Sequence, residues 1–445
     1  MRIREPMQPA TKPVDILRQQ WDLAAEHASR NAVIPEQMER ARKVEVGQTS
    51  SDVVYEENSL ELHHYTPRTD QQYDVPILVV YALINRPYIL DLQPNRSVVR
   101  TLLDGGFDVY LIDWGSPTTL DTTLGLEDYV TRYIANCVDV VSARSEQPAI
   151  NLLGYCMGGA MSAIYTALYP ETVRNLGLLA TGLCFDDTGG VLELWGDEEY
   201  YDPSAIAEMY GNVPAAFFDL GFALMDPVEN FLTKYIYLYD NIDDDDFVEN
   251  FARMETWLAD GVDVPGKVYR QFIEEIYQKN ALARNELTVG GRHVDLDRID
   301  VPTIQIVGEY DHLVPPESSV PFNDLIASAD VHTIEFPTGH VGLSVSSRSH
   351  ADLWPQVCDW FAERSTVDDK RTVKADDPDA GSQETSLESV TGIGSVYAAR
   401  LQEAGIESRE MLAASDPLEV AEAADIATGH IRRWIDQLQD MEREE

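Results

Sequence analysis

The sequence predicts an α/β protein, a mostly parallel β-sheet wrapped by helices. Continuous apolar runs, typical of strands buried on both faces, alternate with helical segments between residues 75 and 183. A glycine-rich stretch at 149–161 turns sharply from such a strand into a helix of small residues. The alternation stops between 184 and 300 and resumes at Val301, which indicates an insertion within one α/β domain.

Length and composition favour one large domain with appendages. The 445 residues exceed an ordinary compact core, and 44% are hydrophobic, as in globular proteins. No apolar run is long enough to span a membrane, and residues 1–7 lack the apolar region of a secretory signal. The four cysteines lack the spacing of a disulfide framework or a zinc site, so we expect reduced thiols, no metal and a cytoplasmic enzyme.

Net charge is the unusual property of the composition. The chain carries 33 basic and 77 acidic residues, a net charge of −44 that is spread along the sequence. Such self-repulsion destabilises a protein in dilute buffer, but concentrated salt screens it, because the Debye length is about 3 Å at 1 M. We infer adaptation to a salt-rich cytoplasm. The acidic sign also argues against nucleic-acid binding through a basic surface.

The N-terminal part is expected to be a helical segment, residues 1–50, followed by an edge hairpin. Residues 52–58 and 59–65 alternate with period two, as in antiparallel strands at a sheet edge. His63 and His64 are adjacent in the second strand and point to opposite faces. Structural roles therefore suit them better than a shared metal ion.

Residues 51–183 form the first part of the expected α/β domain. After the hairpin, buried strands alternate with helices, and this order favours parallel pairing. The expected elements are a strand at 75–81, a helix at 97–104, a strand at 108–115, a helix at 126–145, the strand and helix of 149–161, and a strand at 173–180.

Residues 184–300 are expected to form a helical cap inserted into the domain. The stretch 190–280 contains 17 of the 40 aromatic residues. These side chains either line an apolar binding channel or form the core of the insert, and we expect both uses. The acidic run Asp243–Asp246 is more typical of a solvated turn than of a cation site.

Residues 301–364 complete the domain, with strands at 301–308 and 331–336 and a closing helix at 354–364. The charged stretch at 365–386 contains Gly, Pro and Ser and is typical of a linker.

Residues 387–445 resemble a helix-hairpin-helix module, with Gly-Ile-Gly at 392–394. The resemblance implies a turn of the kind that binds a DNA phosphate in that family. Here 385–445 carry five basic and thirteen acidic residues, which suits phosphate neutralisation poorly. We therefore expect a role in protein contact or stability.

Cys156 is the candidate nucleophile. Gly154 stands two residues before it, Gly158 two residues after it, and Gly159 follows. This spacing is that of the nucleophile elbow between a strand and a helix, with sulfur in place of the usual serine oxygen. The turn is tight, so its neighbours must lack a Cβ, and the helix N-terminus favours a thiolate. The alternative is a buried structural cysteine at a βα turn.

Two later loops supply the groups that such a nucleophile needs. Asp311 follows the strand at 301–308, and His340 follows the next strand between two glycines. Nucleophile, acid, base is the chain order of the α/β-hydrolase fold, so we predict a Cys156–Asp311–His340 triad. His340 would take the thiol proton, and Asp311 would either orient His340 or act as base toward a substrate hydroxyl. Taken alone, His340 is equally well explained as a structural loop histidine, and His312 is expected to be a bystander.

An oxyanion hole is expected from backbone amides, namely that of Met157 and one near Ala82 or Leu83, with Leu83 preferred. The thiol then indicates the class of reaction. A thiolate exchanges readily with thioesters, because one thiolate replaces another at little thermodynamic cost. An acyl-enzyme that passes its acyl group to an alcohol would make the protein a thioester-to-ester acyltransferase.

Several motifs resemble those of the polyhydroxyalkanoate synthases over residues 50–364. They are Gly154–Gly159, Asn85–Pro94, Asp113–Gly115, Gly308–Pro315 and Gly339–Gly342. The chain is most similar to the shorter catalytic subunit of the two-subunit (class III) type, and its acidity resembles haloarchaeal members. The family core lacks the segment after residue 386, which leaves open what controls assembly here.

The resemblance implies polymerisation of (R)-3-hydroxyacyl-CoA, with 3-hydroxybutyryl and 3-hydroxyvaleryl units, and release of CoA. It implies that Cys156 carries the growing chain as a thioester, His340 activates Cys156, and Asp311 activates the attacking 3-hydroxyl. It also implies a separate small synthase subunit, a homodimer, and a cytoplasmic location on polyester granules. No cofactor is expected, because acyl-CoA is a substrate.

Two other functions share some of these features. A Cys-dependent hydrolase, such as a thioesterase or polyester depolymerase, would have the same triad but would not predict the Asn85–Pro94 loop. An inactive granule scaffold would use the C-terminal module as its working part, but an intact set of Cys, Asp and His argues against it.

Overall fold

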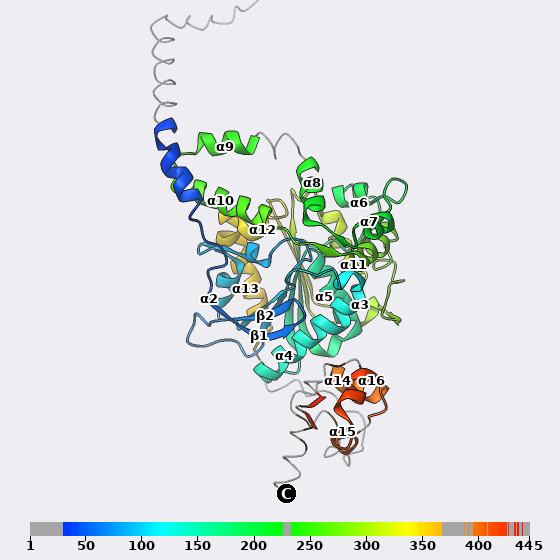
Figure 1. The fold of residues 1–445 in the computed structure, drawn as a ribbon. Helices are drawn as coiled ribbons and strands as arrows, with labels where there is room; N and C mark the ends of the chain where they lie inside the picture. The colour runs from blue at the N-terminus through cyan, green and yellow to red at the C-terminus, as the bar shows by residue number, and fades with distance from the viewer. Residues whose placement is uncertain are drawn as a thin grey trace, which may run out of the picture.

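The computed structural model describes residues 30–225, 233–366 and, with gaps, 387–438 (Figure 1). It confirms the predicted α/β class. A central sheet has helices on both sides, a helical cap along one end and a small helical module near the other (Figure 1). The expected helical segment before residue 30 and most of the expected linker, 367–386, lie outside the described residues.

The central sheet has eight strands. They are β1 (Ser51–Glu57), β2 (Leu60–Tyr65), β3 (Ile77–Val80), β6 (Val109–Asp113), β7 (Ile150–Tyr155), β8 (Val173–Leu179), β13 (Thr303–Gly308) and β14 (Val331–Phe336). Their spatial order is β1-β2-β6-β3-β7-β8-β13-β14. β1 and β2 form the expected antiparallel edge hairpin, and β2 is antiparallel to β6. All pairs from β6 to β14 are parallel, as their continuous apolar sequences predict.

Helices cover both faces of the sheet. They are α2 (Val98–Asp104), α3 (Leu126–Asp128), the π-helix η3 (Tyr129–Ile134), α4 (Ala135–Ser145), α5 (Met157–Leu168) and α13 (Trp354–Ala362). α2 packs with α13, whereas α5 packs with η3 on the other side of the sheet (Figure 1). The helix expected at 126–145 is present, but a π-helical stretch interrupts it. α5 is buried over its whole length, which its small residues permit.

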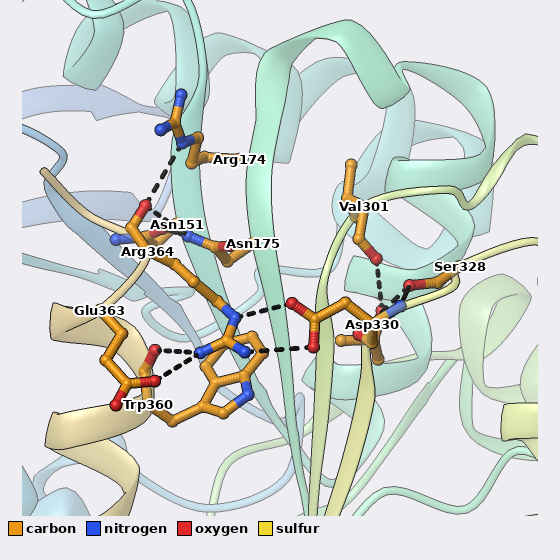
Figure 2. A network of polar contacts seen from close by, with 10 residues as sticks. Asn151, Arg174, Asn175, Val301, Ser328, Asp330, Trp360, Glu363 and Arg364 are labelled. Atoms are coloured by element: carbon orange, nitrogen blue, oxygen red, sulfur yellow. Dashed lines mark hydrogen bonds and ion pairs between the residues drawn. The ribbon is translucent and has the colours of Figure 1, made fainter. Parts of the chain in front are cut away.

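A polar network fastens the end of the domain to the sheet (Figure 2). Arg364, just after α13, donates hydrogen bonds of 3.0 and 3.1 Å to the carboxylate of Asp330, just before β14. The Arg364 guanidinium also stacks on Trp360, with its carbon 4.4 Å from the ring centroid. Next to it, Asn175 donates a 2.6 Å bond to Asn151 and joins β8 to β7. The network lies at the amino ends of the parallel strands, so the carboxyl ends are left for chemistry.

The segment 184–300, which we expected to form a cap, lies between β8 and β13. Its elements are α6 (Val191–Gly196), α7 (Pro203–Tyr210), β9 (Asn212–Val213), α8 (Ala215–Met225), α9 (Lys234–Asp240), α10 (Asp245–Ala259), β10 (Val264–Pro265), α11 (Gly266–Gln271), the π-helix η6 (Phe272–Gln278), β11 (Thr288–Val289) and β12 (Arg292–His293). Phe218 packs on Tyr269 with ring centroids 5.8 Å apart. Aromatic side chains therefore form part of the core of the cap, which is one of the two expected uses.

The acidic run differs from its expected structure. We expected a solvated turn over Asp243–Asp246, but the turn ends at Asp244, and α10 begins at the next residue. The Asp244 carboxylate accepts a 3.1 Å hydrogen bond from the amide of Phe247 and caps the helix. Asp245 accepts a 2.7 Å bond from Gln37 of the helix at 30–41. The run therefore starts a helix, because carboxylates favour the positive end of the helix dipole.

The C-terminal module contains α14 (Ser395–Glu403), α15 (Arg409–Ala413) and α16 (Pro417–Ala424), around a small apolar core of its own. It lies beside α4 in Figure 1. The Tyr397 hydroxyl donates a 2.9 Å hydrogen bond to the side-chain oxygen of Asn136 in α4, and Arg400 donates to the backbone oxygen of Thr131 in η3. The module thus contacts the α/β domain, whereas the Gly-Ile-Gly turn at 392–394 lies outside the described residues.

Candidate active site

Cys156 lies at the turn between β7 and α5, as its glycine spacing predicts. Its backbone has φ 52° and ψ −118°, a conformation that a side chain other than glycine rarely adopts. The amide of Cys156 donates a 2.9 Å hydrogen bond to the backbone oxygen of Leu179 in β8, which fixes the turn against the sheet. The strained turn places the thiol at the carboxyl edge of the sheet, at the start of α5.

The glycines around Cys156 are required by close contacts. A Cβ on Gly154 would lie 2.4 Å from the Cα of Gly159, so strand and helix could not meet. A Cβ on Gly158 would lie 2.1 Å from the backbone oxygen of Val80, and one on Gly159 would lie 1.9 Å from the hydroxyl of Thr181. Any larger side chain would therefore push α5 away from the sheet.

Asp311 and His340 meet beside the turn, as predicted. Asp311 follows β13 and His340 follows β14, and these strands are parallel neighbours in register. His340 Nδ1 lies 2.6 Å from Asp311 Oδ2. Asp311 Oδ1 accepts 2.9 Å bonds from the amides of Leu313 and Val314, and its side chain is fully buried. Both carboxylate oxygens of Asp311 are therefore engaged, one of them in holding the imidazole.

Electrostatics favour a charged imidazole. Burial lowers the pKa of His340, but the Asp311 carboxylate and the Cys156 side chain outweigh it and raise the pKa from 6.5 to about 10. His340 is thus protonated at neutral pH, the state that stabilises a Cys156 thiolate. Burial raises the pKa of Cys184 and Cys358 to about 12.

The two expected oxyanion donors lie in neighbouring segments. Met157 is the first residue of α5, where an amide has no intrahelical acceptor. Leu83 follows β3, and the backbone at the end of β3 packs closely on Gly158, where an added Cβ would lie 2.1 Å from the backbone oxygen of Val80. Met157 and Leu83 are both buried. The packing brings the two loops together, as an oxyanion hole requires.

Aromatic residues around Cys156 were not anticipated. The rings of Tyr81 and Tyr155 stack with centroids 5.5 Å apart, and Tyr155 lies 5.5 Å from the ring of His340. In the cap, burial and, to a smaller extent, the charge of Cys156 raise the pKa of Tyr277. Tyr155 adjoins the nucleophile in sequence and could have been found, whereas nothing in its local sequence distinguishes Tyr277.

Relatives of known name identify the family. The chain is 54% identical over 489 residues to the poly(3-hydroxyalkanoate) polymerase subunit PhaC of Haloferax mediterranei, which covers 98% of this chain and 99% of that protein. It is 51% identical over 471 residues to the protein of the same name from Haloarcula marismortui, with 97% and 99% covered. The chain belongs to the poly(3-hydroxyalkanoate) polymerase family.

More distant matches agree with this family and with the fold. A polymerase subunit from Synechocystis sp. is 39% identical over 326 residues, which are 72% of this chain and 86% of that protein. Residues 19–102 match the N-terminus of poly-beta-hydroxybutyrate polymerase, 75–345 match the alpha/beta hydrolase fold, and 384–440 match a SAM-like helix-hairpin-helix tandem. The two haloarchaeal polymerases also agree with the predicted adaptation to salt.

The loop that carries the resemblance to the polymerase family ties the cap to the domain. It contains the strand β4 (Asp91–Gln93), which pairs with β5 (Arg96–Ser97) just after the loop. The buried carboxylate of Asp91 accepts hydrogen bonds of 2.6–2.8 Å from Ser97 and from the amide and hydroxyl of Thr49. The indole of Trp257, in α10, donates a 2.9 Å bond to the backbone oxygen of Arg86. The loop thus has a structural role, and it positions the cap beside β3.

The other histidines singled out in the sequence do not belong to the cluster of Cys156, Asp311 and His340. His64 lies 2.7 Å from a carboxylate oxygen of Asp108 and stacks on Tyr110 at 4.4 Å, and His63 lies 3.3 Å from Glu61. These contacts give both histidines structural partners. His312 is exposed, next to the buried Asp311.

Within the described ranges, no three His, Cys, Asp or Glu side chains gather as metal ligands, and no helix is long and apolar enough to cross a membrane.

Proposed function

We propose that the chain polymerises (R)-3-hydroxyacyl-CoA into a polyester and releases CoA, with Cys156 as the covalent carrier. Membership of the polymerase family supports an acyltransferase. The observation that carries the Cys156 mechanism is the arrangement of the strained Cys156 turn, the protonated His340 and the buried Asp311. In this proposal the monomer units of the polyester are 3-hydroxybutyrate and 3-hydroxyvalerate.

The first step is acylation of Cys156. Its thiolate, stabilised by the protonated His340, attacks the carbonyl carbon of the acyl-CoA thioester. The oxyanion accepts hydrogen bonds from the amides of Met157 and Leu83. When the carbon–sulfur bond to CoA breaks, His340 gives its proton to the leaving thiolate, and free CoA departs.

The second step is transfer to the 3-hydroxyl of the next monomer. His340, whose other ring nitrogen is held by Asp311, accepts the hydroxyl proton while the oxygen attacks the Cys156 thioester. An ester bond forms, and the Cys156 thiolate is released beside His340, which keeps the proton. The CoA thioester of the lengthened chain then acylates Cys156 again. The two engaged oxygens of Asp311 support its orienting role over direct action as the base.

A separate small subunit, a homodimer and a granule surface complete the proposal. The relatives carry the word subunit in their names, which supports a partner. The cap has most of the large hydrophobic side chains that are exposed in the described residues, and these suit an apolar surface such as polyester. They are Leu194, Trp195, Tyr200, Met209, Tyr210, Leu220, Leu224, Tyr235, Ile236, Tyr237 and Leu258. We place the protein in the cytoplasm, on granules, without a cofactor, a metal ion or nucleic acid.

The test is CoA release from 3-hydroxybutyryl-CoA in molar salt, with and without a co-expressed partner subunit, and with Cys156→Ala as the matched inactive variant. Cys156-dependent release together with high-mass polyester supports the proposal. Release that yields only free 3-hydroxybutyrate indicates a thioesterase. No release in any arm, with the Cys156→Ala protein folded like the parent, indicates the scaffold function.

A further inference from the structure

The segment 82–88 carries the expected oxyanion donor Leu83 and is attached at both ends. Leu83 is buried, and among the described residues its amide has no hydrogen-bond acceptor. A buried amide without an acceptor is rare in proteins, because leaving it unpaired costs free energy. The Leu83 amide is therefore available to an oxygen that arrives with a substrate.

The first attachment comes from the α/β domain. Trp114, just after β6, donates a 2.9 Å hydrogen bond from its indole to the backbone oxygen of Tyr81, two residues before Leu83. The indole is buried and packs edge-on against Tyr129, with ring centroids 5.2 Å apart. The same backbone oxygen lies beside the first turn of α5, because an added Cβ on Gly158 would lie 2.6 Å from it. This end of the segment is thus held next to the nucleophile turn.

The second attachment comes from the cap. Trp257, near the end of α10, donates a 2.9 Å hydrogen bond from its indole to the backbone oxygen of Arg86, three residues after Leu83. The side chain of Trp257 is buried. Tyr88 donates a 3.2 Å bond to the carboxylate of Asp260, the residue just after α10. Two hydrogen bonds therefore fasten this end of the segment to α10.

Between the two attachments the backbone has an unfavourable conformation. Asn85 has φ 63°, in the left-handed region that residues other than glycine rarely adopt. Such a conformation persists only where the surrounding structure enforces it. The Arg86 side chain adds a 2.8 Å bond to the hydroxyl of Ser116. Loss of one attachment should therefore let the segment relax and turn the Leu83 amide away from its present direction.

We propose that Trp257 is a positioning residue supplied by the cap, whose indole N–H holds the segment 82–88 so that the Leu83 amide faces the carbonyl oxygen of a substrate at Cys156. Trp114 holds the other end of the segment. The inference rests on the proposed function in one respect, namely that Cys156 is acylated. It makes the oxyanion hole depend on the seating of the cap, since moving α10 away releases the segment.

The test compares two reactions of Cys156. In alkylation by iodoacetamide, the sulfur bonds to a saturated carbon and iodide leaves, so no oxyanion forms. In acylation by p-nitrophenyl acetate, the sulfur bonds to the carbonyl carbon, an oxyanion forms, and p-nitrophenolate leaves when the carbon–oxygen bond breaks. A donor at the oxyanion therefore accelerates the second reaction alone. Mass spectrometry of the peptide that contains Cys156 measures both rates.

Trp257→Phe removes the indole N–H and keeps an aromatic ring against the segment. We expect acylation of Cys156 to slow about 10- to 100-fold, since an oxyanion donor is displaced. The rate of alkylation and the thermal unfolding curve should remain those of the parent. Trp195→Phe, at an exposed position of the same cap, should leave both rates unchanged.

Tyr88→Phe provides a second variant that leaves the buried indole in place. It removes the other hydrogen bond between the segment and α10, so we expect a smaller loss, about threefold, again in acylation alone. An unchanged rate of acylation in both variants would overturn the inference. Equal losses of acylation and alkylation would also overturn it, because they would show a general disturbance of the site. If Trp257→Phe does not fold, Tyr88→Phe decides between these outcomes.

The inference and the proposed function fail separately. If the parent makes no polymer but Trp257→Phe slows acylation alone, the positioning role stands and the polymerase is refuted. If the parent makes polymer and Trp257→Phe is acylated at the parental rate, the polymerase stands and the positioning role is refuted. A parent whose Cys156 is alkylated but not acylated by the ester would contradict the oxyanion hole at Leu83.

Discussion

At the scale of single residues, part of the site can be predicted from the spacing of glycines and from the position of loops after strands. The elbow around Cys156 was predictable because a Cβ at Gly154, Gly158 or Gly159 would collide with backbone or with Thr181. Asp311 and His340 were predictable because the carboxyl ends of parallel strands share one edge. The packing of Tyr277 on Phe185 and Phe272 was not predictable, because it depends on how the whole cap folds.

The pH dependence of stability should report the coupling between Asp311 and His340. The pKa of His340 is about 10 in the folded protein and near 6.5 when unfolded, so its protonated form contributes stability that is complete below pH 6.5 and is lost as the pH rises through 10. In Asp311→Asn the pKa of His340 falls toward its ordinary value, so we expect this decline between pH 6.5 and 10 to shrink. Chemical denaturation in molar salt at several pH values measures it.

Glu309→Gln is the matched control, because it removes one carboxylate of the same loop from an exposed position. This variant should lose stability between pH 6.5 and 10 to the same extent as the parent. If Asp311→Asn and Glu309→Gln gave the same pH dependence, the raised pKa of His340 would have to be abandoned.

At the scale of elements, the sequence located the strands and helices of the domain well and those of the cap poorly. The strand expected at 75–81 is β3, and the helix expected at 97–104 is α2, capped by Ser97. The bounds of these elements follow from the local pattern of apolar residues and from capping residues. The π-helices η3 and η6 were missed, because one extra residue in a turn leaves no signature in such a pattern.

Capping of α10 gives a prediction within a single acidic run. Asp244→Ala removes the acceptor of the Phe247 amide and should destabilise the start of α10 by about 1 kcal/mol. Asp243→Ala removes the same charge from the neighbouring exposed position, so it should lack this effect. Hydrogen exchange of the first turn of α10 measures the difference. Equal exchange in the two variants would refute the cap.

At the scale of the whole molecule, the C-terminal module is docked on the side of the domain away from the cap. Its Tyr397 reaches Asn136, which also donates a 2.7 Å bond to Glu57 in β1. The resemblance to helix-hairpin-helix proteins indicated the kind of module. The acidic charge of the module argued against DNA binding. The docking face could not be predicted, because it is a match between two surfaces that lie far apart in sequence.

Docking can be tested after cleavage of the chain between residues 366 and 387. The fragment that contains the module should remain bound to the catalytic domain in gel filtration at molar salt. A combined Tyr397→Phe and Arg400→Ala variant should release it, because both contacts with α4 and η3 are weakened. Arg432→Ala, at an exposed position of the module, should not. If the double variant retained the fragment, contacts other than those of Tyr397 and Arg400 would have to hold the module on the domain.

Removal of residues 387–445 should accordingly leave the triad folded, since no triad residue touches the described part of the module. We expect alkylation of Cys156 to keep its parental rate, while assembly or placement on granules is impaired. Unchanged granules and activity would contradict that role.

The insertion of the cap between β8 and β13 also sets the timing of biosynthesis. His340 lies 184 positions after Cys156, a stretch that takes roughly 10–40 s to translate at about 5–20 residues per second. During that interval the strands up to β8 can pair, while the edge of β8 waits for β13. Under the proposed mechanism, Cys156 is therefore synthesised early and its partner His340 last. A nascent chain would carry an inactive thiol, and acyl transfer would begin only when almost the entire domain has left the ribosome.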